Sequence, residues 1–201
     1  MDNIGLALSG GAARGIAHIG VLRALEEQDI PIKFISGTSV GAIIAALYAF
    51  DIELDEIGRF AKSLNLSKVS SFKLSKYGLF DNHNLKDLMC EYIDDSRIED
   101  SKLPLAIIAT DISSGEKVIL KSGSVCDAVC ASSAIPGLFA PVIIDNQSLV
   151  DGGLVQNLPV SVLKEMGADY LIGSDLSGSY KSTKVENIVD IIRNSFGIMV
   201  Y

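Results

Sequence analysis

Histidine, cysteine and positive charge are scarce in this 201-residue chain, and each shortage argues against a class of function. Two histidines and three cysteines are a poor ligand set for zinc. Seventeen basic against twenty-five acidic side chains give a formal net charge of −8 at pH 7. Nucleic-acid binding depends on basic side chains that neutralise phosphates. We therefore expect neither a metal centre nor a nucleic-acid partner.

The cysteines also bear on the cellular setting. Cys90, Cys126 and Cys130 are an odd number, which does not suit a disulfide framework. Cys126 and Cys130 would share one helix face, and we interpret them as small buried apolar side chains. No basic cluster precedes the first apolar segment, so we predict no signal peptide. These features favour a reducing, cytoplasmic setting.

Length and composition predict one folded α/β domain over residues 1–201. Two ordinary domains joined by a linker would need a longer chain. Hydrophobic residues make up 48% of the sequence and charged residues 21%, so most of it should fold. Residues 34–50 carry no charge and approach the roughly 20 residues of a membrane-spanning helix. Because a turn-rich patch interrupts them at residues 36–41, we interpret them as a strand, a tight turn and a helix.

Apolar runs and helical spacing predict an order of elements that is typical of a parallel sheet. The chain opens with two strand-turn-helix units, with strands at residues 4–8 and 32–36 and helices at residues 14–28 and 40–50. Further helices are predicted at residues 54–64, 84–93, 124–134, 160–166 and 185–200, with Asn84 and Ser124 as N-caps. Further strands are predicted at residues 105–110, 117–120, 142–144, 148–150 and 170–174, the last of them buried. Residues 65–77 are predicted to form a surface loop.

Ser39 is the candidate nucleophile. It lies in Gly37-Thr38-Ser39-Val40-Gly41, the pattern of a nucleophile elbow, in which small neighbours leave a serine exposed on a sharp strand-to-helix turn. An apolar strand before the motif and an apolar helix after it supply the context that the pattern needs. The unpaired N–H groups at a helix start favour the negative charge of an attacking serine. The alternative is a serine that only caps the helix.

A nucleophilic serine needs a base, and the histidines are poorly placed to supply one. His18 lies among apolar residues of a predicted helix and His83 in a polar loop, so neither fits the order serine, acid, histidine. We therefore expect a carboxylate base. Asp151 is the first choice because it ends an apolar strand and precedes two glycines, and Asp111 and Asp175, also at strand ends, are the second choices. The alternative for Asp151 is a turn aspartate bonded to the second glycine after it.

An ordinary aspartate has a pKa near 3.9 and is a weak base. The proposed role therefore requires direct contact with Ser39 and favours a pKa raised by burial.

The loop Ser9-Gly10-Gly11-Ala12-Ala13-Arg14-Gly15 is the third candidate element. Between a strand and a helix, its backbone N–H groups can bind an oxyanion or a phosphate. It does not fit a dinucleotide-binding loop, because Ala12 replaces a glycine and no acidic residue ends the second strand. Arg14 is a candidate for orienting the loop or meeting a substrate phosphate, with a surface ion pair as the alternative.

Four segments, in this order, resemble the patatin-like phospholipase family and in particular its small bacterial members. They are residues 9–22 (SGGAARGIAHIGVL), 37–41 (GTSVG), 131–142 (ASSAIPGLFAPV) and 151–159 (DGGLVQNLP). Four matches in order are far more specific than any one of them. Ala12 departs from the glycine spacing of the family.

The resemblance implies a doubly wound, mainly parallel central sheet with helices on both faces, and a Ser-Asp dyad. In this dyad Ser39 attacks and Asp151 is the base. The residues implied for the oxyanion hole are Gly10, Gly11 and Ala12, and those that support the motifs are Arg14, Gly15, Gly37, Gly41, Gly152 and Gly153. The implied reaction is hydrolysis of lipid acyl esters through an acyl-enzyme, of phospholipase A, lysophospholipase or esterase type, without metal or cofactor. Because many members are longer, this chain can lack a C-terminal segment that completes the acyl groove.

Two other functions stay open from the sequence. An acyltransferase would share the first step and pass the acyl group to an alcohol or thiol. A binding module would hold a phosphate or lipid head group, with Ser39 as a helix cap. Lys68, Lys73 and Lys76, beside apolar side chains in residues 66–79, are a candidate site of peripheral contact with an anionic membrane, and a solvated loop is the alternative. The oligomeric state does not follow from the sequence.

Overall fold

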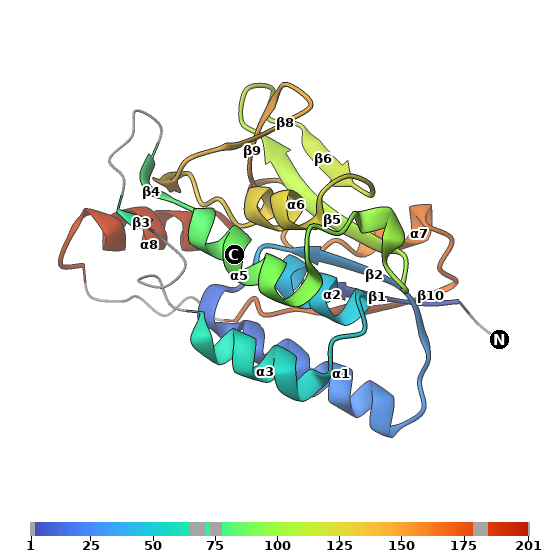
Figure 1. The fold of residues 1–201 in the computed structure, drawn as a ribbon. Helices are drawn as coiled ribbons and strands as arrows, with labels where there is room; N and C mark the ends of the chain where they lie inside the picture. Colours follow the sequence, from blue (N-terminus) through green and yellow to red (C-terminus); the bar gives the residue numbers. More distant parts are fainter. Residues whose placement is uncertain (1–2, 65–70, 73–77, 179–184, 201) are drawn as a thin grey trace.

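A mixed β-sheet forms the centre of the computed structural model, which describes residues 3–64, 71–72, 78–178 and 185–200 (Figure 1). It has seven strands in the order β10-β1-β2-β5-β9-β8, with β6 paired to β5. Four neighbouring strands are parallel, as predicted: β10 (Tyr170–Ser174), β1 (Ile4–Leu8), β2 (Ile32–Thr38) and β5 (Leu105–Asp111). The antiparallel pairs involve β6 (Lys117–Leu120), β8 (Val142–Ile144) and β9 (Gln147–Asp151).

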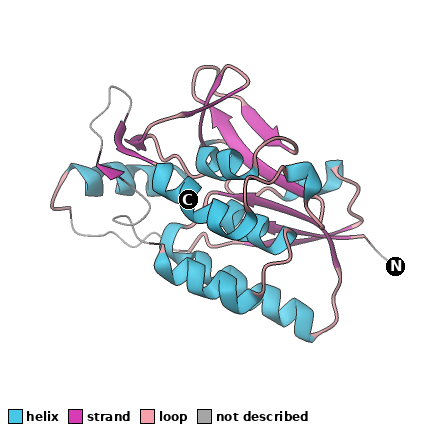
Figure 2. Ribbon diagram, viewed as in Figure 1, coloured by secondary structure: helices cyan, strands magenta, loops and turns pink. Residues whose placement is uncertain are grey.

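Helices cover both faces of this sheet, as predicted (Figure 2). The helices packed on one face are α1 (Ile16–Glu27), α2 (Val40–Ala49), α3 (Leu54–Ser63), α5 (His83–Ile93) and α6 (Val125–Ser132). On the opposite face lies α7 (Val160–Glu165). Both faces of the sheet are apolar at β5, because each face is covered by helices. Ile107 packs with the first group of helices, whereas Ile108 packs against α7. Side chains alternate along a strand, so a continuous apolar run serves both layers.

A second, three-stranded sheet lies at one side of the molecule. Its order is β3 (Ser71–Phe72), β4 (Gly78–Asp81) and β7 (Gly137–Phe139). Helix α8 (Ile188–Val200) packs beside it through Val189 and Ile192. The predicted loop at residues 65–77 therefore contains a short strand at residues 71–72, and its remaining residues lie outside the described ranges, with Lys68, Lys73 and Lys76 among them.

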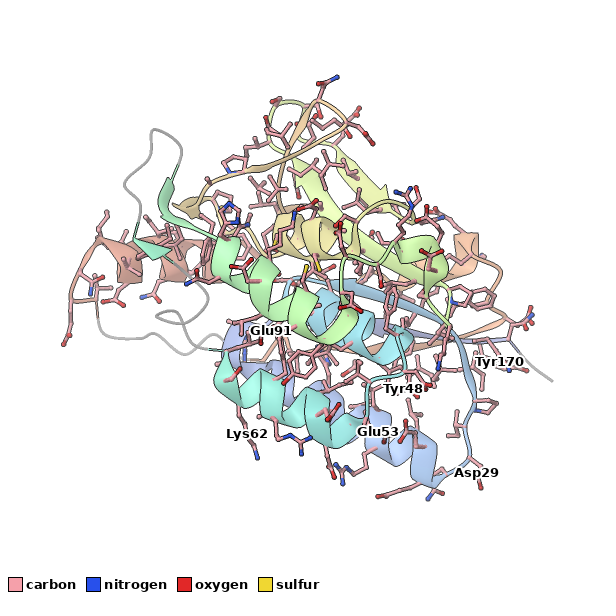
Figure 3. The ribbon with its side chains drawn as sticks, viewed as in Figure 1. Asp29, Tyr48, Glu53, Lys62, Glu91 and Tyr170 are labelled. Carbon is pink, nitrogen blue, oxygen red and sulfur yellow. The ribbon has the colours of Figure 1, made fainter. Side chains whose placement is uncertain are left out.

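Several local predictions need correction. Asn82, rather than Asn84, precedes α5, which begins at His83. Strand β10 is at the edge of the sheet rather than buried, because it pairs only with β1 among the described strands, and the Tyr170 side chain is 58% exposed there (Figure 3). Helix α8 begins at Ile188 rather than at residue 185, and the Ile188 and Met199 side chains are largely exposed.

Other local predictions are confirmed. Ser124 is the N-cap of α6, and its Oγ accepts a hydrogen bond from the Asp127 N–H at 3.3 Å. Cys126 and Cys130 are both buried in the same helix. The strand predicted at residues 117–120 is present as β6, which pairs antiparallel with β5.

The register around β5 determines where the candidate catalytic residues meet. Strand β2 pairs along the first half of β5 and ends with Thr38 opposite Ile108. Strand β9 runs the other way along the second half and ends with Asp151 opposite Ala109. Because β6 occupies the other edge of β5 over this region, β2 and β9 share one edge and meet end to end. Consecutive residues of β5 therefore bring the chain end at Ser39 next to Asp151.

Candidate active site

Ser39 stands on a strained turn between β2 and α2. Its backbone has φ 54° and ψ −125°, a combination that costs energy for any residue with a Cβ and is typical of functional sites. Its N–H donates to the Oγ of Ser132 at 2.9 Å, and that hydroxyl donates to the carbonyl of Ile108 at 2.6 Å. The Ser39 side chain makes no capping hydrogen bond to α2, and the residue is only half-buried. This geometry weighs against the helix-cap alternative.

The glycines around Ser39 are required by close backbone contacts. A Cβ at Gly41 would lie 2.3 Å from the carbonyl oxygen of Leu8, and a Cβ at Gly37 would lie 2.4 Å from the carbonyl oxygen of Gly41. A Cβ at Gly15 would lie 2.2 Å from Cγ2 of Val40. These glycines let β1, α2 and the turn before α1 approach one another around the serine.

Asp151 is fully buried at the end of β9, just before the short 3₁₀ helix η3 (Gly152–Leu154). Its Oδ1 accepts a hydrogen bond from the Gly153 N–H at 2.8 Å. Asp151 therefore does stabilise the turn, which was the alternative role expected from the sequence. That role occupies one carboxylate oxygen only. Oδ2 is buried and makes no closed hydrogen bond with any described residue. The carboxyl group therefore has one oxygen left for chemistry.

The environment raises the pKa of Asp151 to about 7. Burial is the main cause, because it disfavours the charged carboxylate. Hydrogen bonds from the Gly153 N–H and from the Ser39 hydroxyl act in the opposite direction and lower this pKa. The Ser39 hydroxyl thus lies near enough to influence the carboxyl group, although no bond of standard length and angle is closed at Oδ2. Such contacts are often loose without substrate.

The glycine loop lies directly over Ser39. A Cβ at Gly10 would be 3.3 Å from the Cβ of Ser39. The Gly10 N–H already donates to the carbonyl oxygen of Asn157 at 3.2 Å, so it has a partner within the protein. No described residue accepts a hydrogen bond from the N–H of Gly11 or Ala12. Ala12 has φ 49°, a left-handed backbone that glycine would adopt more easily.

The second-choice carboxylates serve other local structures. Asp111 accepts hydrogen bonds from the Ser113 N–H at 2.9 Å and from the Ser114 hydroxyl at 3.2 Å, within the hairpin turn after β5. Asp175 accepts from the Ser177 N–H at 2.8 Å in an exposed loop. Arg14 donates from Nε to the carbonyl of Gly11 at 3.3 Å, which agrees with the loop-orienting alternative.

Sequence reasoning missed two residues of this site, Ser132 and Asn157. Both lie in segments that carry the family resemblance, at residues 131–142 and 151–159. Their positions inside those segments were the available signal, but their roles depend on hydrogen bonds to residues far away in the chain.

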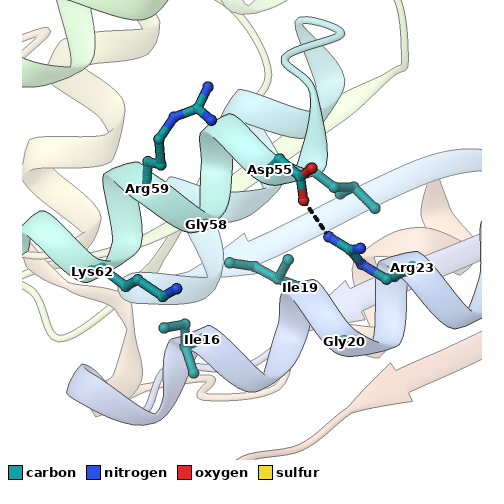
Figure 4. Close-up of a pocket in the computed structure, with 9 residues that line it drawn as sticks. Ile16, Ile19, Gly20, Arg23, Asp55, Gly58, Arg59 and Lys62 are labelled. Atoms are coloured by element: carbon teal, nitrogen blue, oxygen red, sulfur yellow. Dashed lines mark hydrogen bonds and ion pairs between the residues drawn. The ribbon is translucent and has the colours of Figure 1, made fainter.

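The surface of the described residues includes a cleft and a groove of similar size. A cleft of about 370 Å³ lies between α1 and α3 and is spanned by the ion pair of Arg23 and Asp55 at 2.6 Å (Figure 4). It contains neither Ser39 nor Asp151. A groove of about 330 Å³ lies between α8 and the segment after Asp151, and its lining is almost wholly apolar. Its lining residues are Ile112, Pro136, Leu154, Ile191, Ile192, Ser195, Phe196 and Met199.

Neither a cluster of metal-ligating side chains nor a membrane-spanning helix occurs in residues 3–64, 71–72, 78–178 and 185–200. Within those ranges, we find no cluster of three or more His, Cys, Asp or Glu side chains that would hold a metal ion. The helices there lack the length and apolar character needed to cross a membrane.

Comparison with known proteins identifies the family. Residues 6–164 match the sequence profile described as patatin-like phospholipase. This chain belongs to the patatin-like phospholipase family. An uncharacterized NTE family protein of Mycobacterium tuberculosis is 35% identical over 179 residues, which are 88% of this chain and 49% of the relative. A protein named lysophospholipase NTE1 from Yarrowia lipolytica is 35% identical over 201 residues, 96% of this chain and 14% of the relative.

This patatin-like chain thus spans about half the length of the mycobacterial relatives and a smaller part of the fungal ones. The solved structure of VipD from Legionella pneumophila shares its fold, with a TM-score of 0.63, 16% sequence identity, and coverage of 79% of this chain and 47% of that chain. The type III effector ExoU has a TM-score of 0.50 at 18% identity over 69% of this chain and 39% of its own. These likenesses confirm the predicted α/β fold.

Replacing Gly41 by alanine should destabilise the protein, because the new Cβ would press on the backbone of β1. We expect the free energy of unfolding to fall by about 1–3 kcal/mol. Gly20→Ala is the matched control, since a Cβ there meets nothing within 4 Å and alanine favours the helix interior, so stability should rise by up to about 1 kcal/mol. Urea denaturation measures both values, and equal effects would contradict the close contact.

Asp151→Asn should alter how stability depends on pH. The folded protein holds the Asp151 proton up to about pH 7, whereas the unfolded chain releases it at the ordinary pKa of 3.8. Stability from this group is therefore lost as pH rises between these values. The variant does not lose stability in this way. The difference obtained by subtracting the native free energy of unfolding from that of the variant should therefore increase from pH 5 to pH 8. Urea denaturation at both pH values tests this, and a constant difference would exclude a buried, proton-binding Asp151.

Proposed function

We propose that this chain hydrolyses lipid acyl esters, in the manner of a phospholipase A, a lysophospholipase or an esterase, with Ser39 and Asp151 as a catalytic dyad. The observation that carries the proposal is the uncommitted Oδ2 of a buried carboxyl group beside a serine on a strained turn. Both ring nitrogens of His18 are bonded elsewhere, to Ser9 and Ser174, so that histidine is not available as the base.

In the proposed reaction, the Oγ of Ser39 attacks the acyl carbonyl while its proton passes to Asp151. The carbonyl oxygen becomes an oxyanion, which the N–H groups of Gly11 and Ala12 can stabilise because they have no acceptor among the described residues. The tetrahedral intermediate then expels the alcohol, which takes the proton from Asp151 and leaves an acyl-enzyme. Water then gives a proton to Asp151 and attacks the acyl carbonyl. The second tetrahedral intermediate expels the Oγ of Ser39, which takes the proton back from Asp151 as the fatty acid leaves.

The raised pKa of Asp151 makes this base more effective than an ordinary aspartate. A base works best when its pKa is near the working pH, and burial brings this carboxyl group to about 7. The start of α2 supports the same step, since its N–H groups and dipole lie next to Ser39 and favour negative charge there.

An apolar groove formed partly by residues close to Asp151 along the chain suits an apolar substrate, and neither Ser39 nor Asp151 lines it. The groove of about 330 Å³ is lined by Leu154, three residues after Asp151, and by Pro136, two residues after the Ala134 carbonyl that holds the Asp151 N–H. Apolar grooves of this size are typical of sites for small apolar ligands. The family membership and the lysophospholipase relatives agree with a lipid ester as substrate.

Removing either member of the dyad should abolish turnover. We expect Ser39→Ala and Asp151→Asn to lower hydrolysis of p-nitrophenyl acyl esters by about 10⁴-fold or more, and Ser39→Ala to lose labelling by a fluorophosphonate. Asp111→Asn is the matched control, because it changes another carboxylate at a strand end and should leave hydrolysis near the native rate. Activity that survives in Asp151→Asn but is lost in Asp111→Asn would contradict the proposal and make Asp111 on β5 the base.

Product analysis separates hydrolysis from acyl transfer. With a long-chain acyl ester and an added alcohol, the proposed hydrolase should release mainly free fatty acid, since water takes the acyl group in the second step. If most of the acyl group is transferred to the alcohol and Ser39 is still required, the protein is an acyltransferase rather than a hydrolase.

The rate should also follow the ionisation of Asp151. Only the carboxylate form can accept the Ser39 proton, so kcat/KM should fall as pH decreases, with a midpoint near 7. The rate of fluorophosphonate labelling, measured from pH 5 to pH 9, should fall over the same range. A midpoint near 4 in both assays would mean that Asp151 is not buried in the working enzyme.

A further inference from the structure

His18 is a buried polar residue in α1 with a defined hydrogen-bonding role. It has no exposed surface, its Nε2 lies 2.8 Å from the carbonyl oxygen of Ser9, and its Nδ1 lies 2.8 Å from the hydroxyl of Ser174. A carbonyl oxygen only accepts hydrogen bonds, so Nε2 carries the proton and Nδ1 accepts from Ser174. Burial lowers the pKa of His18, against the opposing effects of the Ser9 carbonyl and of the Asp175 charge, which agrees with this neutral form.

Ser9 is held on several sides. Its N–H donates to the carbonyl of Ser174 at 3.1 Å. Its hydroxyl accepts from the Leu176 N–H at 2.8 Å and lies 3.1 Å from the carbonyl of Gly10, to which it donates. With the His18 bond, the start of the glycine loop is tied both to α1 and to the end of β10.

One peptide unit transmits this constraint into the loop. The carbonyl of Ser9 and the N–H of Gly10 belong to the same planar group. His18 holds the oxygen of this group, and the carbonyl of Asn157 accepts from its N–H at 3.2 Å. A planar unit held at both ends cannot rotate, so it sets the direction in which the chain enters Gly11 and Ala12. Those two residues carry the N–H groups that lack an acceptor among the described residues.

We propose that His18 is a positioning residue that orients the loop amides of Gly11 and Ala12 toward the oxyanion by holding the Ser9–Gly10 peptide. This inference rests on the proposed function, because it assigns His18 a part in that reaction. His18 touches no reacting atom, and its effect passes through the loop. Oxyanion donors act on the transition state, so a misdirected loop should lower kcat more than it changes KM.

Two variants separate the two hydrogen bonds of the imidazole. His18→Gln can place an amide N–H near the position of Nε2 and keep the bond to Ser9. His18→Asn is shorter, reaches the position of Nδ1 and leaves the Ser9 carbonyl without its donor. We expect kcat for p-nitrophenyl esters to fall by about 10- to 100-fold in His18→Asn, with KM changed less than about threefold. His18→Gln should restore kcat to within about fivefold of the native value.

Titration of active serines distinguishes positioning from mere stabilisation. The amount of Ser39 that a fluorophosphonate labels gives the concentration of folded sites, and kcat is calculated per labelled site. A structural role alone would lower the labelled amount and leave kcat per site unchanged, which would overturn the proposal. Equal kcat in the Gln and Asn variants would overturn it as well.

The pH profile supplies a further readout. Because Asp151 sets the acid limb, His18→Gln should keep its midpoint near 7. Disappearance of that limb would make His18 the titrating base and refute the positioning role. If the native protein shows neither hydrolysis nor labelling that depends on Ser39, the proposed function itself is wrong. If the native protein is active but its kcat does not change when His18 is replaced, only the positioning role of His18 is wrong.

Discussion

Two strands share one edge of β5, and the proposed chemistry depends on that shared edge. Strand β2 pairs with β5 as far as Ile108, and β9 takes over from Ala109 in the opposite direction. A strand has only two edges, and β6 fills the other one in this region. The ends of β2 and β9 must therefore face each other. Ser39 and Asp151 meet there although most of the chain separates them in the sequence.

The burial that comes with this meeting changes the acidity of Asp151. At the end of β9 the carboxyl group is covered by the sheet, by α6 and by its own glycine turn, and its pKa rises to about 7. Thr110 donates to the Asp151 carbonyl at 2.9 Å, and the Ala134 carbonyl accepts from the Asp151 N–H at 3.0 Å, so the backbone at this point is held as well. Fixed position and raised pKa have a common origin in the packing of β9, and both serve the proposed base.

The site also depends on contacts between elements that are distant in the chain. The carbonyl of Asn157 holds the loop at Gly10, Ser132 on α6 holds the turn at Ser39, and Ser174 on β10 joins His18 to Ser9. These contacts join the candidate site to α6, to β10 and to the loop between η3 and α7. The geometry of the loop and of the nucleophile is therefore a property of the whole α/β layer structure rather than of one motif.

Much of the local structure could be predicted because it depends on short-range physics. The apolar run before Ser39, the small residues around it and the apolar helix after it act within about one turn of chain, so the strand, the elbow and α2 follow from the sequence. The shortage of histidine likewise favours a carboxylate as the proposed base. The sequence also placed Ser124 at the start of α6 and a strand at residues 117–120.

Only the tertiary structure distinguished among residues with equivalent local patterns. Asp111 and Asp151 end strands and Asp175 directly follows one. The register on β5 puts Asp151, and neither of the others, beside Ser39. Likewise, only the tertiary structure shows that the Gly10 N–H donates to the Asn157 carbonyl and that β10 lies at the edge of the sheet. The same holds for the hydrogen bonds of His18 with Ser9 and Ser174. The physical reason is that pairing register and edge position arise from contacts between distant segments, whereas periodicity and turn chemistry report only on neighbours in the chain.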